Sequence, residues 1–332
     1  MKRKIAIIGA TGMVGRMFLT VLEEHGIDAD YELFASSRSA GSTLTFFGKP
    51  YVVSELNESS FAGKGFSYAL FSAGGAISEK YAPLAAEAGA TVIDNSSQWR
   101  MDPTVPLVVP EVNPEALSSI PKGIVANPNC STIQAVVPLK ALDDAFGIKR
   151  IVYSTYQAVS GAGQKGYQDL EDGLCGALPK KFPHPIAGNC IPHIDVFLPN
   201  GYTKEEQKMI DETRKILSRP DLRVTATCVR VPVYHGHSES INVEFERPFT
   251  LEEVYRVLEQ KEGVVICDDP KNNVYPMPIN AAGTDPVYVG RIRMDDSVEN
   301  GLNFWCVADN IRKGAALNAV QIMEQLIKGE NK

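Results

Sequence analysis

The first apolar segment of the chain reads KIAIIGATGMVG over residues Lys4–Gly15. Its isoleucine-rich start predicts a buried strand, and its three glycines allow a tight turn. Phe18, Val21 and Leu22 then recur at helical spacing. Strand, glycine turn and helix are typical of a dinucleotide site, where backbone N–H groups and the positive helix end receive a pyrophosphate. The GxxGxxG spacing is weak by itself, so a glycine-rich surface turn is the alternative.

Short strand-like runs continue through the first 130 residues, with helical stretches between them: Ile5–Ile8, Glu32–Ala35, Tyr68–Phe71, Thr91–Ile93, Leu107–Val109 and Ile124–Ala126. This alternation predicts a parallel sheet covered on both faces, a Rossmann-like doubly wound α/β half. Longer strands follow and predict an α+β half with a mixed or antiparallel sheet: Ile151–Val159, Val224–Val233, Ser240–Glu246, Val287–Arg293 and Leu302–Val307.

Three further helices are predicted, over Lys204–Leu217, Thr250–Gln260 and Ile311–Ile327. The second opens with a capping box of Thr250 and Glu253. We expect the last helix to return to the first domain. The predicted domains are therefore residues 1–129 with 311–332, and residues 130–310.

Size and charge narrow the function classes. A chain of 332 residues should split into two domains. A net charge of −7 without basic clusters argues against nucleic acid and anionic membranes as partners. Six scattered cysteines without a CxxC pair indicate a reducing cytoplasm, and no apolar run is long enough to span a bilayer.

The end of the second predicted strand bears on the choice of dinucleotide. An NAD-selective site places an acidic residue there, whereas this chain reads ASSRS over Ala35–Ser39. A guanidinium among hydroxyls suits a 2′-phosphate, so we expect NADP, with Arg38 pairing or stacking and Ser36 and Ser39 donating. An exposed loop arginine is the alternative. The SAGG stretch, Ser72–Gly75, is a second expected contact.

Short-chain reductases share the GxxGxxG spacing but need a tyrosine with a lysine four residues later. None of the twelve tyrosines has lysine at that position, which excludes that class.

Cys130 differs from the other cysteines by its context. The stretch ANPNCST, Ala126–Thr132, leads directly into the apolar helical run Ile133–Leu142, so Cys130 is expected at or beside a helix N-terminus. The partial positive charge there favours the nucleophilic thiolate. A buried structural thiol is the alternative for Cys130 and the expected state of the others: Cys175, Cys190, Cys228, Cys267 and Cys306.

A thiol nucleophile needs a base, and either His235 or His237 could serve. The HxH pair and Cys190-x-x-His193 lack further ligands nearby, so no metal is expected. A thiol beside a nicotinamide suits acylating aldehyde chemistry, because a thioester accepts a hydride far more easily than a carboxylate does.

Several segments together resemble the aspartate-β-semialdehyde dehydrogenase family over nearly the whole chain. They are GATGMVG at residues 9–15, Asn129–Thr132, Tyr156–Gly163, Ile191–Asp195, Arg230–His237 and Ala308–Asn310. The resemblance implies NADPH-dependent reductive dephosphorylation of L-aspartyl 4-phosphate to aspartate semialdehyde, at the branch toward lysine, threonine and methionine. It also implies a nucleotide-binding first domain, a catalytic and dimerisation second domain, and homodimers or tetramers.

Roles carried over from this resemblance are as follows. Cys130 would attack the acyl phosphate, His237 would be general acid and base, and Gln157 would orient the acyl-enzyme. Arg230 would clamp the substrate α-carboxylate and Glu205 would meet its amino group. The phosphate would be held by Arg100, Asn129 and Lys208. The bland alternatives are a loop arginine for Arg100, a strand glutamine for Gln157, and a solvated pair for Glu205 and Lys208.

The cofactor-binding residues expected from the motifs and the resemblance form one set: Gly9, Thr11, Gly12, Met13, Val14, Ser36, Arg38, Ser39, Ser72, Gly74, Ser160, Gly161 and Asn310.

Gly188 and Cys190 stand where larger apolar residues are expected, and His235 is an unusual neighbour of His237. These departures bear on subunit packing and on the pKa of His237. The nearest enzyme alternative is an N-acetyl-glutamyl-phosphate reductase, for which Glu205 would have no ammonium to meet. A non-catalytic NADPH-sensing protein is the alternative from another class.

Overall fold

The computed structural model describes residues 2–330, which form two compact units, residues 2–128 with 315–330 and residues 129–314. The boundaries differ slightly from those predicted. Asn129 joins the second unit because its N–H donates to Glu212 Oε2 at 2.6 Å. Residues 311–314 do so because Asp309 accepts the N–H groups of Ile311 at 2.8 Å, Arg312 at 2.9 Å and Gly314 at 2.9 Å.

The first unit is built on a six-stranded parallel sheet of order β5-β2-β1-β6-β7-β8. Chain order runs outward from β1 on one side and then from β6 on the other, so the topology reverses between these two strands. The strands are β1 (Lys4–Ile8), β2 (Asp30–Ala35), β5 (Ser54–Glu55), β6 (Tyr68–Phe71), β7 (Thr91–Asp94) and β8 (Ile124–Ala126). A hairpin of β3 (Thr43–Phe46) and β4 (Lys49–Val52), not predicted from the sequence, forms a separate two-stranded sheet in this unit.

Both faces of this sheet are covered. Ile5 and Ile7 of β1 lie in one apolar cluster with Phe18 of α1 (Met13–Glu24) and Val320 of α8 (Asn318–Glu330). The intervening side chains of β1 are fully buried too, on the opposite face. The third helix of this unit is α2 (Gly75–Glu87). The doubly wound half and the return of the C-terminal helix are confirmed.

The predicted strand Leu107–Val109 is wrong. Only Leu107 forms a bridge, with Ala126 of β8. Pro106 and Pro110 flank the segment, and neither has an N–H to extend a ladder.

The second unit contains a mixed six-stranded sheet of order β10-β9-β11-β14-β13-β12. Its outer pairs are parallel and its inner pairs antiparallel, as in the predicted α+β half. The strands are β9 (Ile148–Gln157), β10 (Arg223–Arg230), β11 (His237–Phe245), β12 (Val264–Ile266), β13 (Val287–Asp295) and β14 (Gly301–Ala308).

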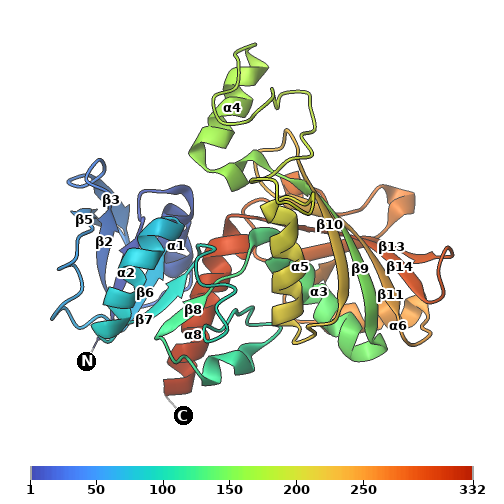
Figure 1. Cartoon of the computed structure of the whole chain (residues 1–332), viewed down its shortest axis with the longest axis horizontal. Helices are drawn as coiled ribbons and strands as arrows, with labels where there is room; N and C mark the ends of the chain where they lie inside the picture. Colours follow the sequence, from blue (N-terminus) through green and yellow to red (C-terminus); the bar gives the residue numbers. More distant parts are fainter. Residues whose placement is uncertain (1, 331–332) are drawn as a thin grey trace. The chain divides into compact units, whose positions relative to one another are not determined.

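Helices α3 and α5 lie side by side along this sheet, and a segment carrying α4 projects away from it (Figure 1). The helices of the unit are α3 (Cys130–Phe146), α4 (Gln164–Leu174), α5 (Lys204–Ile216), α6 (Leu251–Glu259) and α7 (Pro278–Ala281). The predicted capping box of Thr250 and Glu253 opens α6. None of the helices described in residues 2–330 is long and apolar enough to cross a membrane.

Candidate active site

The glycine turn after β1 lies where the strand order reverses, the usual ligand site of an open parallel sheet. Gly9 has φ +83°, and a Cβ there would lie 2.3 Å from the Ser72 carbonyl oxygen after β6. A Cβ on Gly15 would lie 2.1 Å from the Gly9 carbonyl oxygen. Only glycine fits either position, so the loop forms a close-fitting backbone cradle.

The residues predicted to contact a pyrophosphate follow this turn directly. Thr11 precedes the N-cap of α1, Gly12, and Met13 and Val14 form the first turn of the helix. Because the N-cap is a glycine, no side chain caps the start of α1, and its first turn contains no acidic residue. Gly74 likewise caps α2 without a side-chain bond. Both helix starts therefore present N–H groups to an anion, as a dinucleotide requires.

The end of β2 lacks the carboxylate of an NAD-selective site. Ser36 and Arg38 are exposed just beyond Ala35, and Ser39 is half-buried. Positive charge and hydroxyls at this position fit a 2′-phosphate.

Arg100 belongs to the same unit. Its side chain is buried, and its Nε and Nη2 donate to the carbonyls of Asn127 at 2.9 Å and Asn95 at 3.0 Å. The guanidinium is therefore fixed by main-chain carbonyls, so Arg100 is not an exposed, unconstrained loop arginine.

In the second unit, Cys130 is the first residue of α3, as the sequence predicted. Asn129 is the N-cap, and its Oδ1 accepts the N–H groups of Ser131 at 3.0 Å and Thr132 at 3.4 Å. The thiol therefore lies at the positive end of a 17-residue helix, which favours its thiolate form.

His237 is the first residue of β11, and its Nε2 lies 3.2 Å from Cys130 Sγ. Its other ring nitrogen, Nδ1, accepts the N–H of Ala158 at 3.0 Å. Nδ1 therefore carries no proton, and the proton of the neutral ring is on Nε2, facing the sulfur. Burial, together with the charge of Arg230, lowers the pKa of His237 to about 3, which keeps the ring neutral.

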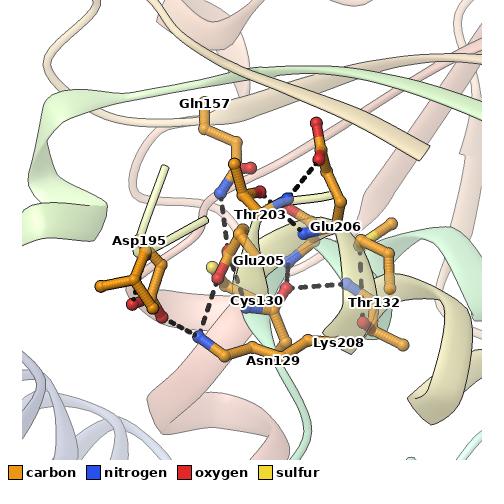
Figure 2. Close-up of polar contacts among 12 residues, drawn as sticks. Asn129, Cys130, Thr132, Gln157, Asp195, Thr203, Glu205, Glu206 and Lys208 are labelled. Atoms are coloured by element: carbon orange, nitrogen blue, oxygen red, sulfur yellow. Dashed lines mark hydrogen bonds and ion pairs between the residues drawn. The ribbon is translucent and has the colours of Figure 1, made fainter. Parts of the chain in front are cut away.

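Four predicted residues form one hydrogen-bonded cluster beside Cys130 (Figure 2). Glu205, in the first turn of α5, accepts Asn129 Nδ2 at 2.8 Å and Gln157 Nε2 at 3.1 Å on one oxygen. Its other oxygen contacts Lys208 Nζ at 3.0 Å. Gln157 is oriented from both ends, because its Oε1 accepts Thr155 Oγ1 at 3.0 Å. Glu205 is thus no solvated surface residue: it is 5% exposed.

Arg230 ends β10 beside Gln157 and is also buried. Its Nη1 donates to the Ala158 carbonyl at 2.6 Å. Burial lowers its pKa, and Glu205 acts against this. A Cβ on Gly161 would lie 2.9 Å from Arg230 Nη1 and 3.3 Å from His237 Nε2. Glycine there leaves the two side chains room.

Ser160 and Asn310 are buried and hydrogen-bonded to one another, with Asn310 Nδ2 donating to Ser160 Oγ at 3.0 Å. Asn310 Oδ1 also accepts the N–H of Gly236 at 2.9 Å. These two predicted cofactor residues therefore support the loop that leads into His237.

The structure describes the surroundings of the three residues that depart from the family pattern. Gly188 has φ +68°, a conformation that favours glycine, and Cys190 is exposed. The His235 ring lies 5.7 Å from the Tyr167 ring. Burial and Arg230, not His235, account for the lowered pKa of His237.

Several residues around the cluster were not singled out as site residues from the sequence. They are the Ala158 N–H, Glu212, which holds Asn129, and Asp195, which contacts Lys208 Nζ at 2.9 Å. Asp195 and Ala158 had a signal, since they lie in the Ile191–Asp195 and Tyr156–Gly163 segments of the family pattern, whereas Glu212 had none. No group of three potential metal ligands gathers within the described part of the chain.

Comparison with protein-family models finds one match in each unit. Residues 4–120 match the model described as "Semialdehyde dehydrogenase, NAD binding domain", and residues 139–313 match "Semialdehyde dehydrogenase, dimerisation domain". The chain belongs to the semialdehyde dehydrogenase family.

The relatives within this family carry a narrower name. The aspartate-semialdehyde dehydrogenase of Aquifex aeolicus is 59% identical over 335 residues, covering 98% of each chain. A solved structure of aspartate semialdehyde dehydrogenase II from Vibrio cholerae, complexed with ASA, has a TM-score of 0.94 at 49% identity and 99% coverage of both chains. The Candida albicans enzyme, solved with NADP, has a TM-score of 0.78 at 28% identity and 98% coverage of both.

Proposed function

We propose that this chain acts as an aspartate-semialdehyde dehydrogenase. It reduces L-aspartyl 4-phosphate with NADPH, releasing phosphate and L-aspartate 4-semialdehyde. The observation that carries the proposal is the pairing of Cys130 Sγ with His237 Nε2 at 3.2 Å, at the N-terminus of α3. The names of the relatives support the choice of substrate.

The thiolate of Cys130 is the nucleophile. Its sulfur forms a bond to the acyl carbon as the bond from that carbon to the phosphate oxygen breaks, which leaves a thioester on the protein and frees phosphate. NADPH, when bound, supplies the hydride that reduces the thioester carbon. The carbon–sulfur bond then breaks, releasing the aldehyde and returning Cys130 as a thiolate.

His237 acts through its Nε2 proton. In the resting protein this N–H faces Cys130 Sγ and stabilises the thiolate. As charge moves to the acyl oxygen, the same N–H stabilises that oxyanion or gives it its proton, and takes the proton back in the next step. Gln157 orients the acyl group.

Two charged residues fix the substrate's amino-acid end. Arg230 receives the α-carboxylate, because a planar guanidinium can bind both carboxylate oxygens. Glu205 receives the α-ammonium, which disfavours an N-acylated substrate that has only an amide there. Arg100, Asn129 and Lys208 bind the phosphate.

The dinucleotide is NADP. Gly9, Thr11, Gly12, Met13 and Val14 would hold the pyrophosphate, with Ser72 and Gly74 beside them. Ser36, Arg38 and Ser39 would hold the 2′-phosphate. Ser160, Gly161 and Asn310 would contact the nicotinamide end.

We further propose a homodimer in the cytoplasm. The match of residues 139–313 to a dimerisation domain supports the dimer. All six cysteines are thiols, which supports a reducing compartment.

The test is phosphate-dependent reduction of NADP with each of two semialdehydes. Activity is expected with aspartate semialdehyde and not with N-acetylglutamate semialdehyde. Activity with the N-acetylated compound alone would contradict the proposal. An intact-mass increase on Cys130 after mixing with aspartyl phosphate, without dinucleotide, would show the thioester directly.

A further inference from the structure

Lys208 lies between two carboxylates in the cluster beside Cys130 (Figure 2). Its Nζ is 3.0 Å from Glu205 Oε2 and 2.9 Å from Asp195 Oδ2. Asp195 comes from the segment before α5, so the two acids approach the ammonium from different parts of the chain. The proposed substrate contacts include Glu205 and Lys208, whereas no role has been given to Asp195.

All three groups are charged at neutral pH. Burial acts to raise the pKa of Glu205, but Lys208, Asn129 and Gln157 together lower it to about 2. Burial likewise acts to raise the pKa of Asp195, and Lys208 lowers it. The pKa of Lys208 is raised by both carboxylates, against the effect of burial. Two carboxylates and one ammonium leave this group with a net charge of −1.

The backbone of Asp195 is held in an unusual conformation. Its φ is +68°, in the left-handed region, which aspartate tolerates better than most residues because its side chain can bond nearby backbone. Here Oδ1 accepts the N–H of Val196 at 2.9 Å, which leaves Oδ2 directed at Lys208. Strained backbone of this kind persists where the surrounding structure requires it.

We propose that Asp195 is a positioning residue that draws Lys208 partly away from Glu205, so that Glu205 remains available to the substrate ammonium. Without Asp195, Glu205 and Lys208 would form a neutral pair with no electrostatic need for a further cation. With Asp195, the excess negative charge is satisfied by one more cation. The inference rests on the proposed function, in which Glu205 meets that ammonium.

The charges then match the substrate at both ends. The group of Asp195, Lys208 and Glu205 carries −1 and faces the α-ammonium, while Arg230 carries +1 and faces the α-carboxylate. Succinic semialdehyde has the carboxylate but lacks the amino group. Asp195 therefore increases the preference of the site for aspartate semialdehyde over this deamino compound.

The first experiment measures kcat/KM for both semialdehydes in the phosphate-dependent direction. Asp195→Asn keeps the size of the side chain and its bond to Val196 but presents an amide donor to Lys208. The ratio of aspartate to succinic semialdehyde is expected to fall on the order of tenfold, the effect of one hydrogen bond to a charged group. An unchanged ratio would overturn the inference while leaving the proposed function intact.

Asp172→Asn is the matched control. Asp172 pairs with Lys180 at 3.2 Å and its side chain is 29% exposed, against 33% for Asp195, but it lies in α4 outside the cluster. Its substitution should leave the ratio unchanged. An equal fall in both variants would also count against a specific role for Asp195. A wild-type chain inactive on aspartate semialdehyde would instead overturn the proposed function, and this inference with it.

A second variant reverses the expected sign and does not depend on Asp195→Asn folding. Lys208→Met removes the cation that competes for Glu205, so the preference for the amino compound should be kept or increased, while the KM for phosphate rises. A fall in that preference would show that Lys208 helps Glu205 to bind the ammonium, and would overturn the inference.

Discussion

The two units build their sites from different materials. The nucleotide unit uses backbone: Gly9 and Gly15 fit positions without room for a side chain, and the start of α1 presents bare N–H groups. The catalytic unit uses buried charged side chains that satisfy one another, with Glu205 at their centre. A backbone site is read from local spacing, whereas a side-chain site is assembled from distant segments. We therefore expect the first site to tolerate exchange of more side chains than the second.

The largest expected effect separates chemistry from dinucleotide binding. Cys130→Ser should lower kcat by about 10⁴-fold or more, because the nucleophile is lost. NADP affinity, measured by fluorescence titration, should stay within a few-fold, since the backbone cradle is in the other unit. Cys175→Ser, at an exposed thiol, is the control and should keep full activity. Retained turnover in Cys130→Ser would remove the thiol from the mechanism.

Gly9→Ala tests the backbone site. The new Cβ collides with the Ser72 carbonyl and stands on a residue whose φ is +83°. The free energy of unfolding should therefore fall by about 3 kcal/mol, and the affinity for NADP should fall on the order of hundredfold. Gly41→Ala has the same φ of +83° in open space and should cost about 1 kcal/mol. Denaturant unfolding of both variants measures the difference. Equal losses would mean that the close approach to Ser72 contributes nothing.

Arg38→Ala tests the charged side chain expected in the nucleotide site. Losing a guanidinium–phosphate contact should weaken NADP binding on the order of tenfold and leave NAD binding nearly unchanged. Lys49→Ala, at another exposed cation of the same unit, is the control. A parallel loss for both dinucleotides would mean that Arg38 does not read the 2′-phosphate.

The last effect, which is small near neutral pH, is a pH dependence of stability due to His237. Its pKa is about 3 in the folded protein, against an ordinary 6.5. Between these values the unfolded chain binds a proton that the folded chain does not, so stability falls as pH drops below about 6.5, by on the order of 1 kcal/mol per pH unit. His237→Asn should flatten this part of the profile, measured by urea unfolding, whereas exposed His184→Asn should not. Identical profiles in all three proteins would contradict the buried neutral ring.

The same contrast explains how far the sequence leads. The strand, glycine turn and helix at Lys4–Gly15 were predictable because each follows from neighbouring residues. So was Cys130 at a helix start, since Asn129 is a good N-cap before an apolar run. The strand prediction for residues 107–109 was wrong because a valine-rich run predicts a strand, while the flanking prolines lack the N–H groups that a ladder needs.

The clustering of Glu205 with Asn129 and Gln157 could not be derived from their order in the chain. It depends on α5 packing beside α3 and on the register of β9 with β10, which no local pattern encodes. The resemblance to a family named these residues, but it did not indicate that they bind one another. Asp195 and the Ala158 N–H were missed for the same reason.

The bond from Ala158 to His237 Nδ1 has an evolutionary consequence. Its donor is main chain, so the donor group is present whatever residue stands at this position, proline excepted. The tautomer of the histidine is thus insulated from point mutation in a way that no side-chain partner could match. Ala158 has φ −63°, an angle that proline adopts without strain. A single change to proline would therefore remove the N–H donor while keeping the backbone angle φ. The position of the proton on the His237 ring therefore depends on the backbone and not on any side chain that contacts the ring.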